Sequence, residues 1–355
     1  MSASAWGAAG LPACPISLRD YPRVTLAHGA GGRLSAELVE RMFVATLGGE
    51  SLRARHDGAR VRVGGRGDVV ITTDTYVVSP LRFPGGDIGT LAVYGTTNDL
   101  AMCGARPRAL SLGLVLEEGL PMDTLWRQVL AIRAACELVG VEVVTGDTKV
   151  VERGKGDGMF VNTTGVGAPV DAPAPRPARV RPGDAIIVTG DLGRHGIAVL
   201  AARDQLMIET PIESDLATLV EPALALLEGG VDVRCLRDLT RGGLASALNE
   251  LAASAGVRVE LDEERVAVHP TVRGVCELLG FDPLYVANEG RFVAIVAPEH
   301  VDAALELLRR FPVTAEAVAV GRVLERGPAE VVGRSAYGTT RVVDMLSGAQ
   351  LPRIC

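Results

Sequence analysis

Several aspartates occur where the sequence predicts a strand end or the inward face of a helix. Asp74 closes an apolar strand, Asp99 falls on the apolar stripe of a helix, and Asp147 follows a short strand. A buried carboxylate costs several kcal/mol unless it is paired or binds a cation. Because Mg²⁺ prefers a few hard oxygen ligands, the set predicts a site for magnesium and a polyphosphate. Turn capping by each aspartate, and a buried hydrogen-bond pair of Asn98 with Asp99, are the alternatives.

Two other segments have the composition of an anion site. Residues 238–243 lead from a strand into a helix, whose first-turn N–H groups would lie beside Arg241. The glycine turn at residues 28–32 could close over a phosphate as a flap. A plain helix start and a plain turn are equally consistent with these patterns. The turn at residues 193–196 is interpreted as structural.

The last residue of the chain, Cys355, is the most specific feature. The other cysteines are scattered without a CxxC or CxH pair, which disfavours a zinc site or a redox dithiol. A thiol on a free tail could enter a distant pocket, receive a group as a thioester-like adduct and leave again. A tail thiol that serves as a metal ligand is the rival interpretation.

Two further charged residues, Lys149 and Glu289, occupy informative positions. Lys149 and Lys155 are the only lysines among 36 basic residues. A lysine retained against that bias indicates a position that needs a compact ammonium able to lose its proton. Glu289 precedes the apolar strand 292–297 and would lie at its mouth, where a solvated turn glutamate is the alternative.

The composition is that of an acidic globular protein. The chain has 355 residues, 48% of them hydrophobic and 22% charged, and a net charge of −7. That length predicts about two domains, and the acidic balance argues against a nucleic-acid binder. No apolar run approaches the ~18 residues needed to span a bilayer, and residues 1–15 lack the basic start of a secretory signal. We therefore expect a cytoplasmic protein that binds neither nucleic acid nor membrane.

Alternating strands and helices predict an α/β or α+β fold of two units. In the first unit, residues 25–168, we expect strands at 68–78, 109–116, 141–144 and 159–166 and helices at 35–47, 87–102 and 122–138. In the second, residues 183–346, we expect strands at 185–188 and 292–297 and helices near 215–228, 242–255 and 299–311. Outside these units we expect a loose extension at 1–24, a stiff proline-rich linker at 169–182 and a mobile tail at 347–355.

Five segments, in order, resemble motifs of the HypE family of hydrogenase maturation factors, which are carbamoyl dehydratases. They are residues 83–89 (FPGGDIG), 98–101 (NDLA), 146–152 (GDTKVVE), 288–290 (NEG) and 352–355 (PRIC). The likeness runs from about residue 25 to the end of the chain. A wider resemblance is to PurM-like enzymes that use ATP, such as aminoimidazole ribonucleotide synthetase. P-loop, dinucleotide-binding and nucleophile-elbow motifs do not occur in the sequence.

The resemblance implies a two-domain PurM-like subunit that forms a homodimer through its N-terminal mixed sheet and binds ATP near the domain junction. The ATP contacts that it implies are His28, Gly31, Gly32, Asp74, Asn98, Asp99, Asp147, Thr148 and Arg241. The Mg²⁺ ligands that it implies are Asp74, Asp99 and Asp147, with Asp57 and Asp238 as weaker candidates. The catalytic residues would be Cys355, Glu289 as the base, and Lys149 as its electrostatic partner.

The resemblance also implies the reaction and its partners. HypF would load a carbamoyl group on Cys355, the enzyme would dehydrate it to a thiocyanate with ATP, and the cyanide would pass to iron on a HypC–HypD scaffold for [NiFe]-hydrogenase. Phosphoryl transfer from ATP turns the carbamoyl oxygen into a good leaving group. Two alternatives remain open. One is another PurM-like phosphotransferase, and the other is a non-catalytic metallochaperone that uses the tail thiol as a ligand.

Overall fold

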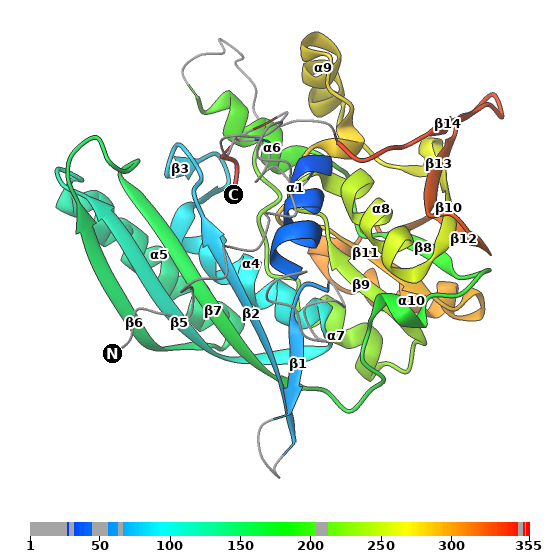
Figure 1. The fold of residues 1–355 in the computed structure, drawn as a ribbon, viewed down its shortest axis with the longest axis horizontal. Helices are drawn as coiled ribbons and strands as arrows, with labels where there is room; N and C mark the ends of the chain where they lie inside the picture. The colour runs from blue at the N-terminus through cyan, green and yellow to red at the C-terminus, as the bar shows by residue number, and fades with distance from the viewer. Residues whose placement is uncertain are drawn as a thin grey trace, which may run out of the picture.

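Two β-sheets, one in each half of the chain, organise the molecule (Figure 1). The computed structural model describes residues 27, 32–44, 56–62, 67–203, 212–346, 351 and 353–355. The expected extension at 1–24, the glycine turn at 28–31 and most of the segment 347–352 lie outside the described residues. No helix among those described is both long and apolar enough to cross a bilayer.

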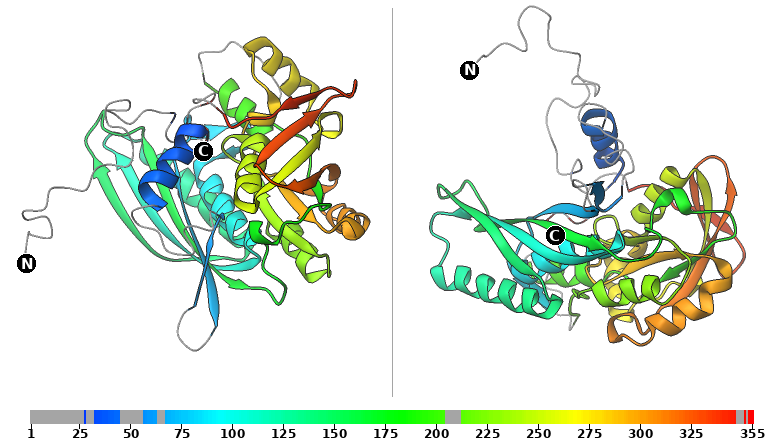
Figure 2. Two further views of the ribbon diagram at one scale, coloured as in Figure 1. Left: turned by 45° about the vertical axis from the view of Figure 1, so that its right-hand side comes forward. Right: turned by 90° about the horizontal axis from the view of Figure 1, so that it is seen from below.

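The first sheet is mixed, as the sequence predicts. Its strands run in the order β1-β2-β7-β5-β6 and comprise Ala59–Arg62, Asp68–Tyr76, Met159–Pro169, Ala105–Glu117 and Glu142–Val151. β5 and β6 are parallel and are joined by helix α5 (Met122–Val139), whereas the other neighbours are antiparallel. Helices α4 and α5 cover one face of this sheet, and α5 lies beneath it in the right-hand view of Figure 2.

Helix α4 (Ile88–Met102) is buried along almost its whole length because it packs against β2, β7, α5 and α7 (Val220–Glu228). Asp87 caps it by accepting a hydrogen bond from the N–H of Thr90 (2.8 Å), which confirms the predicted start. Asn98 and Asp99 are therefore carried into the interior, where a polar side chain needs a partner.

The second sheet has the order β14-β13-β10-β12-β8-β11-β9. These strands comprise Thr340–Val342, Glu330–Arg334, Val257–Asp262, Val318–Arg326, Ala185–Val188, Phe292–Val296 and Val233–Asp238. Its helices are α6 (Arg194–Ala201), α7 (Val220–Glu228), α8 (Gly243–Ala255), α9 (Pro270–Leu279) and α10 (Val301–Leu308).

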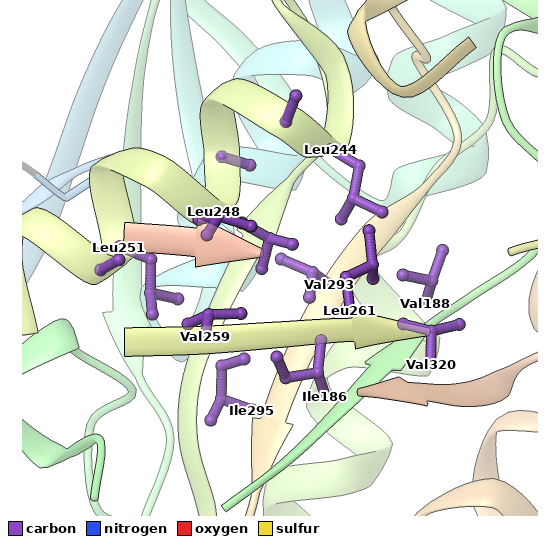
Figure 3. Close-up of a cluster of buried hydrophobic side chains, with 14 of the residues drawn as sticks. Ile186, Val188, Leu244, Leu248, Leu251, Val259, Leu261, Val293, Ile295 and Val320 are labelled. Carbon is purple, nitrogen blue, oxygen red and sulfur yellow. The ribbon is translucent and has the colours of Figure 1, made fainter. Parts of the chain in front are cut away.

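The core of the second unit follows the two-residue period of a strand. In β11, Val293 and Ile295 pack beneath α8 with Ile186 and Leu248 (Figure 3). Phe292 and the other alternate residues of β11 face α7 and α10. Since both faces are covered, this strand is apolar throughout, as is usual for the centre of an α/β layer.

Short elements complete the fold. Helix α1 (Arg33–Leu38) continues into a π-helical segment, Val39–Val44, where the sequence predicts one helix over 35–47. The strands β3 (Arg82–Phe83) and β4 (Gly86–Asp87) form a small hairpin before α4.

The two units are joined by polar contacts and by the predicted linker. Asn98 accepts a hydrogen bond from the N–H of Leu219 (2.7 Å) and donates one to the carbonyl of Ala217 (3.1 Å). The linker carbonyl of Pro175 lies 3.0 Å from Nε2 of His56. The proline-rich segment is thus packed along the junction between the units.

Two sequence-based element predictions were wrong. The strand predicted at 141–144 continues to Val151, because residues 145–151 pair in parallel with β5. Residues 145–151 are polar because this edge strand is exposed, and the prediction from apolar residues therefore ended the strand at residue 144. The turn at 193–196 is the start of α6, and His195 is fully buried there.

Candidate active site

An acidic cavity of about 240 Å³ lies where the two units meet. Glu250 lines it together with four aspartates, Asp57, Asp74, Asp99 and Asp238. Asp57 precedes β1, and the others come from β2, α4 and the end of β9. The fold thus gathers four of the five carboxylates that the sequence analysis considered as magnesium ligands.

These carboxylates are buried close to one another, so their negative charges repel. Burial, and then Asp74 and Asp238, raise the pKa of Asp99 well above its usual range. Burial, and then Asp57, raise the pKa of Asp238 to about 8. Burial also raises the pKa of Asp74, against the opposing charge of Arg241. A cation in this cavity would relieve the repulsion, because opposite charge favours ionised carboxylates.

Two arginines supply part of the positive charge. Nε of Arg237 lies 3.6 Å from Asp57, and its guanidinium also pairs with Glu250. Arg241 lines the cavity just before α8. The turn there requires glycine, since Gly243 has φ +58° and a Cβ would come within 2.6 Å of a backbone carbonyl oxygen. The predicted strand–glycine–helix turn therefore delivers Arg241 to the acidic cavity.

The donor set fits a magnesium–phosphate complex better than a bare metal ion. Oδ2 of Asp57 is buried and has no hydrogen-bond partner among the described residues. However, no group of three or more described His, Cys, Asp or Glu side chains could hold a metal ion on its own. Mg²⁺ typically takes one or two carboxylates and completes its octahedron with phosphate oxygens and water.

A larger cavity of about 540 Å³ adjoins the acidic one. Both are lined by Ser35, Asp57, Arg237 and Glu250. The larger one also has a more apolar wall, to which Val39 contributes from the π-helical segment. Together the two cavities offer a charged end and an apolar end, as an elongated polyanion with an aromatic group requires.

The end of the chain lies between the two units, and Cys355 lines a small cavity of about 30 Å³ (Figure 1). Glu289 lines the same cavity. Four residues line both this cavity and the acidic one: Asp74, Asp238, Thr240 and Arg241. Burial raises the pKa of the Cys355 thiol to about 12, with Arg241 acting in the opposite direction. The thiol is therefore held in its neutral form beside the acidic cavity.

Main-chain hydrogen bonds hold the tail in place. The N–H of Val77 donates to the carbonyl of Cys355 (3.0 Å), and that of Ser79 donates to the carbonyl of Arg353 (3.2 Å). Ile354 is buried in an apolar cluster that includes Val78. The described end of the chain thus lies alongside the segment that follows β2 and pairs with it almost as an added strand would.

Glu289 is buried, and its Oε1 has no hydrogen-bond partner among the described residues. Burial, and then Asp238 and Asp215, raise its pKa well above its usual range. The two residues that flank Glu289 in the motif have structural roles. Asn288 accepts from the N–H of Gly193 (2.7 Å), and a Cβ on Gly290 would collide with the carbonyl of Asp215. Asn288 and Gly290 shape the turn, so Glu289 is the member of the motif left free for chemistry.

Asp147 does not join the acidic cavity within one chain, which corrects the expectation of a single set. Directly paired residues point to the same face of a sheet. Asp147 pairs with Gly113, Gly113 with Asn162, and Asn162 with Thr75. Asp74 is the neighbour of Thr75 and therefore points to the opposite face. Strand β6 is also three strands from β2, roughly 14 Å at the usual spacing.

Thr148 and Lys149 belong to the same exposed strand. Lys149 pairs with the carboxylate of Asp147, which accepts a hydrogen bond from the N–H of Thr148 (2.9 Å). The side chains of Asp147 and Lys149 are open to solvent on the sheet face away from α4, whereas that of Thr148, between them, points to the opposite face. In one chain they contact neither Cys355 nor Glu289.

The remaining predicted ATP contacts have different outcomes. The amide of Asn98 joins the two units and lines neither the acidic nor the larger cavity. Gly32 caps α1, where a Cβ would collide with the carbonyl of Leu346. His28 and Gly31 lie outside the described residues.

The sequence analysis missed three residues of this region. Tyr76 donates a hydrogen bond to Asp74 (3.1 Å), and the two-residue spacing on one strand could have indicated it. Arg237 and His195 had no such signal, because only the tertiary fold brings them to their partners at Asp57 and Ile354.

Known proteins share this architecture. Residues 55–168 match the AIR synthase related protein, N-terminal domain, and residues 181–334 match the AIR synthase related protein, C-terminal domain. The chain is 49% identical over 341 residues to the carbamoyl dehydratase HypE of Cupriavidus necator, covering 96% of this chain and 97% of that protein.

Solved structures agree with these matches. A chain in the crystal structure of a HypE–HypF complex has a TM-score of 0.82 at 38% identity, covering 87% of this chain and 99% of that one. The hydrogenase maturation protein HypE in complex with ATP has a TM-score of 0.78 at 44% identity, covering 94% and 100%. The predicted two-unit α/β fold is confirmed.

Proposed function

This chain belongs to the HypE family of carbamoyl dehydratases, which act in hydrogenase maturation, and we propose that it dehydrates a carbamoyl group carried on the sulfur of Cys355. One observation carries the proposal. The terminal thiol and the acidic cavity lie side by side and share four lining residues. A group on that sulfur would therefore meet a phosphate bound among the carboxylates.

ATP would occupy the two adjoining cavities. The triphosphate would lie in the acidic one with Mg²⁺ held by carboxylates drawn from Asp57, Asp74, Asp99 and Asp238, and the nucleoside would lie in the larger one. The raised pKa values and the unpartnered oxygen of Asp57 support a cation there. When bound, magnesium would neutralise charge on the transferring phosphoryl group. Binding of ATP by a HypE that is 44% identical supports the same assignment.

The proposed reaction balances with one ATP. The thiocarbamate R–S–C(=O)–NH₂ and ATP give the thiocyanate R–S–C≡N, ADP and inorganic phosphate. The carbamoyl oxygen leaves on phosphate, and the nitrogen loses both of its protons as the triple bond forms. The chain must therefore supply a phosphate-orienting group and a base.

Glu289 is the proposed base, and Arg241 the orienting cation. Both line the small cavity that contains Cys355. Burial raises the pKa of Glu289, so its carboxylate, when ionised, is a stronger base than an ordinary glutamate. Arg241 lines the acidic cavity as well, so its charge can act on phosphate oxygens.

Loading of the thiol would take place outside the pocket. A thiol whose pKa is about 12 is a poor nucleophile at pH 7, whereas an exposed cysteine has a pKa of about 8.5. The tail would accept the carbamoyl group from HypF when undocked and would return for dehydration. A HypE–HypF complex is known for a chain that is 38% identical. A HypC–HypD scaffold would receive the cyanide.

A second copy of the chain would complete the site. The face of the first sheet away from α4 carries exposed valines, among them Val115 and Val166. Asp147 and Lys149 lie on the same face, out of reach of their own Cys355. A homodimer through this face would cover the valines and offer Lys149 to the partner's pocket. Lys149 would there act as the electrostatic partner of Glu289.

Mass spectrometry of the C-terminal peptide tests the proposal. Carbamoyl-loaded protein given Mg·ATP should lose the mass of one water from this peptide, and C355A should accept no carbamoyl group. C276A is the matched control, since Cys276 is buried in another cluster. An unchanged mass together with bound iron would instead support the metallochaperone, and ATP turnover on a free substrate by C355A would support another phosphotransferase.

A further inference from the structure

His195 contacts the docked tail although it lines none of the three cavities described above. It lies at the start of α6 and is fully buried. Its Nε2 is 2.6 Å from the carbonyl oxygen of Ile354, and its Nδ1 is 2.8 Å from Oγ of Ser214. Its backbone N–H donates to Oδ1 of Asp215 (3.0 Å). The ring therefore bridges the second unit and the residue that precedes Cys355.

The hydrogen bonds fix which nitrogen carries the proton. A carbonyl oxygen only accepts, so Nε2 of His195 must donate to Ile354. The N–H of Leu216 donates to Oγ of Ser214 (3.0 Å), which leaves the Ser214 hydroxyl proton free to donate to Nδ1. With a neutral imidazole, each group in this series of hydrogen bonds has a partner. Burial lowers the pKa of His195, in agreement with the neutral form.

The hairpin of β3 and β4, which contains the FPGG segment at residues 83–86, packs against the His195 ring from the other side. Phe83 meets His195 edge-on, with ring centroids 5.2 Å apart. The N–H of Ser214 donates to the carbonyl of Pro84 (2.9 Å), and a Cβ on Gly85 would approach that N–H within 2.8 Å. Gly85 has φ +85°, so glycine is needed on both counts. This motif thus builds the support of His195, away from the acidic cavity.

We propose that His195 is a positioning residue of the dehydration: its Nε2–H holds the carbonyl of Ile354 and thereby seats the sulfur of Cys355 in its pocket. The inference rests on the proposed function. The Ile354 carbonyl is joined directly to the nitrogen of Cys355, so fixing it fixes the plane of the last peptide bond and the position of the Cys355 Cα, from which the thiol projects. The other tail hydrogen bonds act on residues 353 and 355, and His195 alone among the described side chains binds the carbonyl between them.

The test compares H195F with H195Q. Phenylalanine keeps the ring contact with Phe83 but cannot donate, whereas glutamine keeps a donor. The readout is the rate at which iodoacetamide alkylates Cys355 in the full chain without ATP, followed on the C-terminal peptide. Loss of one buried hydrogen bond should speed alkylation roughly tenfold in H195F, and H195Q should stay within about threefold of wild type. Single-turnover dehydration of preloaded H195F should slow by a similar factor, with unchanged ATP affinity.

A second variant covers a failure of H195F to fold. S214A removes the hydroxyl that fixes the tautomer and should give a smaller acceleration of alkylation. Equal protection of Cys355 in wild type, S214A and H195F would overturn the role of His195 while leaving the docked tail intact. A wild-type thiol that reacts as fast as one in a free peptide would instead overturn the docked tail, and with it the proposed function.

Discussion

Two groups of charged residues that look alike in the sequence have opposite surroundings in the fold. Asp74, Asp99 and Asp238 share a buried cavity, and their pKa values are raised by burial and by one another. Asp147 and Lys149 are exposed on an edge strand, and the pKa of Asp147 is lowered by its hydrogen bond to Lys149. The buried aspartates need a cation to balance their negative charge. The charge of the exposed Asp147 is already balanced by Lys149, and this pair becomes functional only if another subunit covers it.

The strongest test of the buried region is its base. E289Q removes the proton acceptor but keeps the shape, so dehydration of the preloaded tail should fall by about 10²- to 10⁴-fold. ATP affinity should hold, because Glu289 does not line the acidic cavity. Rapid-quench analysis of the C-terminal peptide and nucleotide titration measure the two quantities. Near-normal turnover would assign the proton transfer to another group.

Mixed dimers test whether the exposed region serves the partner subunit. K149A and E289Q should each be inactive alone. After subunit exchange of equal amounts, half the dimers are mixed, and each mixed dimer has one pocket with both Lys149 and Glu289. Activity should therefore return to roughly a quarter of wild type. K149R should not replace lysine fully, since a planar guanidinium does not fit where a compact ammonium does. No recovery on mixing would mean that Lys149 acts within its own chain or not at all.

The acidic cavity should make stability depend on pH. The pKa of Asp238 is raised to about 8 in the folded chain, whereas an unfolded aspartate has a pKa near 3.9. Between these values the folded state binds more protons, so the ligand-free protein should lose stability as pH rises from about 4 to 8. Thermal melts should show this fall, and Mg·ATP should raise the Tm more at pH 8 than at pH 6. D238N should flatten the pH profile, and an unchanged profile would contradict the raised pKa.

The smallest effect is expected at the exposed aspartate. D147N should leave the Tm of the ligand-free protein unchanged, because the side chain is open to solvent. It should still weaken Mg·ATP binding if the partner's strand reaches the nucleotide. Calorimetric titration of the dimer checks this, with D123N on the outer helix α5 as the matched control. Equal affinity in D147N and wild type would remove Asp147 from the nucleotide site.

Local pattern was sufficient for much of this fold. The start of α4 follows from Asp87 and the glycine break before it, and the helix cap is as expected. The segment 141–151 shows the limit of that approach. Gly146 and Asp147 have turn composition, and only the parallel pairing with β5 makes the segment a strand. Because this segment is part of the strand, the pairing with β5 fixes the sheet face to which Asp147 points.

The candidate site shows the same limit. Asp74 and Asp99 could be predicted as a set, because one carboxylate follows the apolar run of a strand and the other lies on the apolar stripe of a helix. Asn98 has the same pattern but links the two units, since a buried amide can satisfy backbone groups from either side. The role of His195 could not be predicted, because its partner is the main-chain carbonyl of Ile354, and any residue type has such a carbonyl.

The fate of the carbamoyl oxygen tests the central claim most directly. Protein loaded on Cys355 with carbamoyl carrying a heavy oxygen isotope is given Mg·ATP, and the phosphate released is analysed by mass spectrometry. The account predicts that the isotope appears in inorganic phosphate, one atom for each thiocyanate formed. Isotope found in water, with unlabelled phosphate, would contradict phosphoryl transfer to the tail in this cavity.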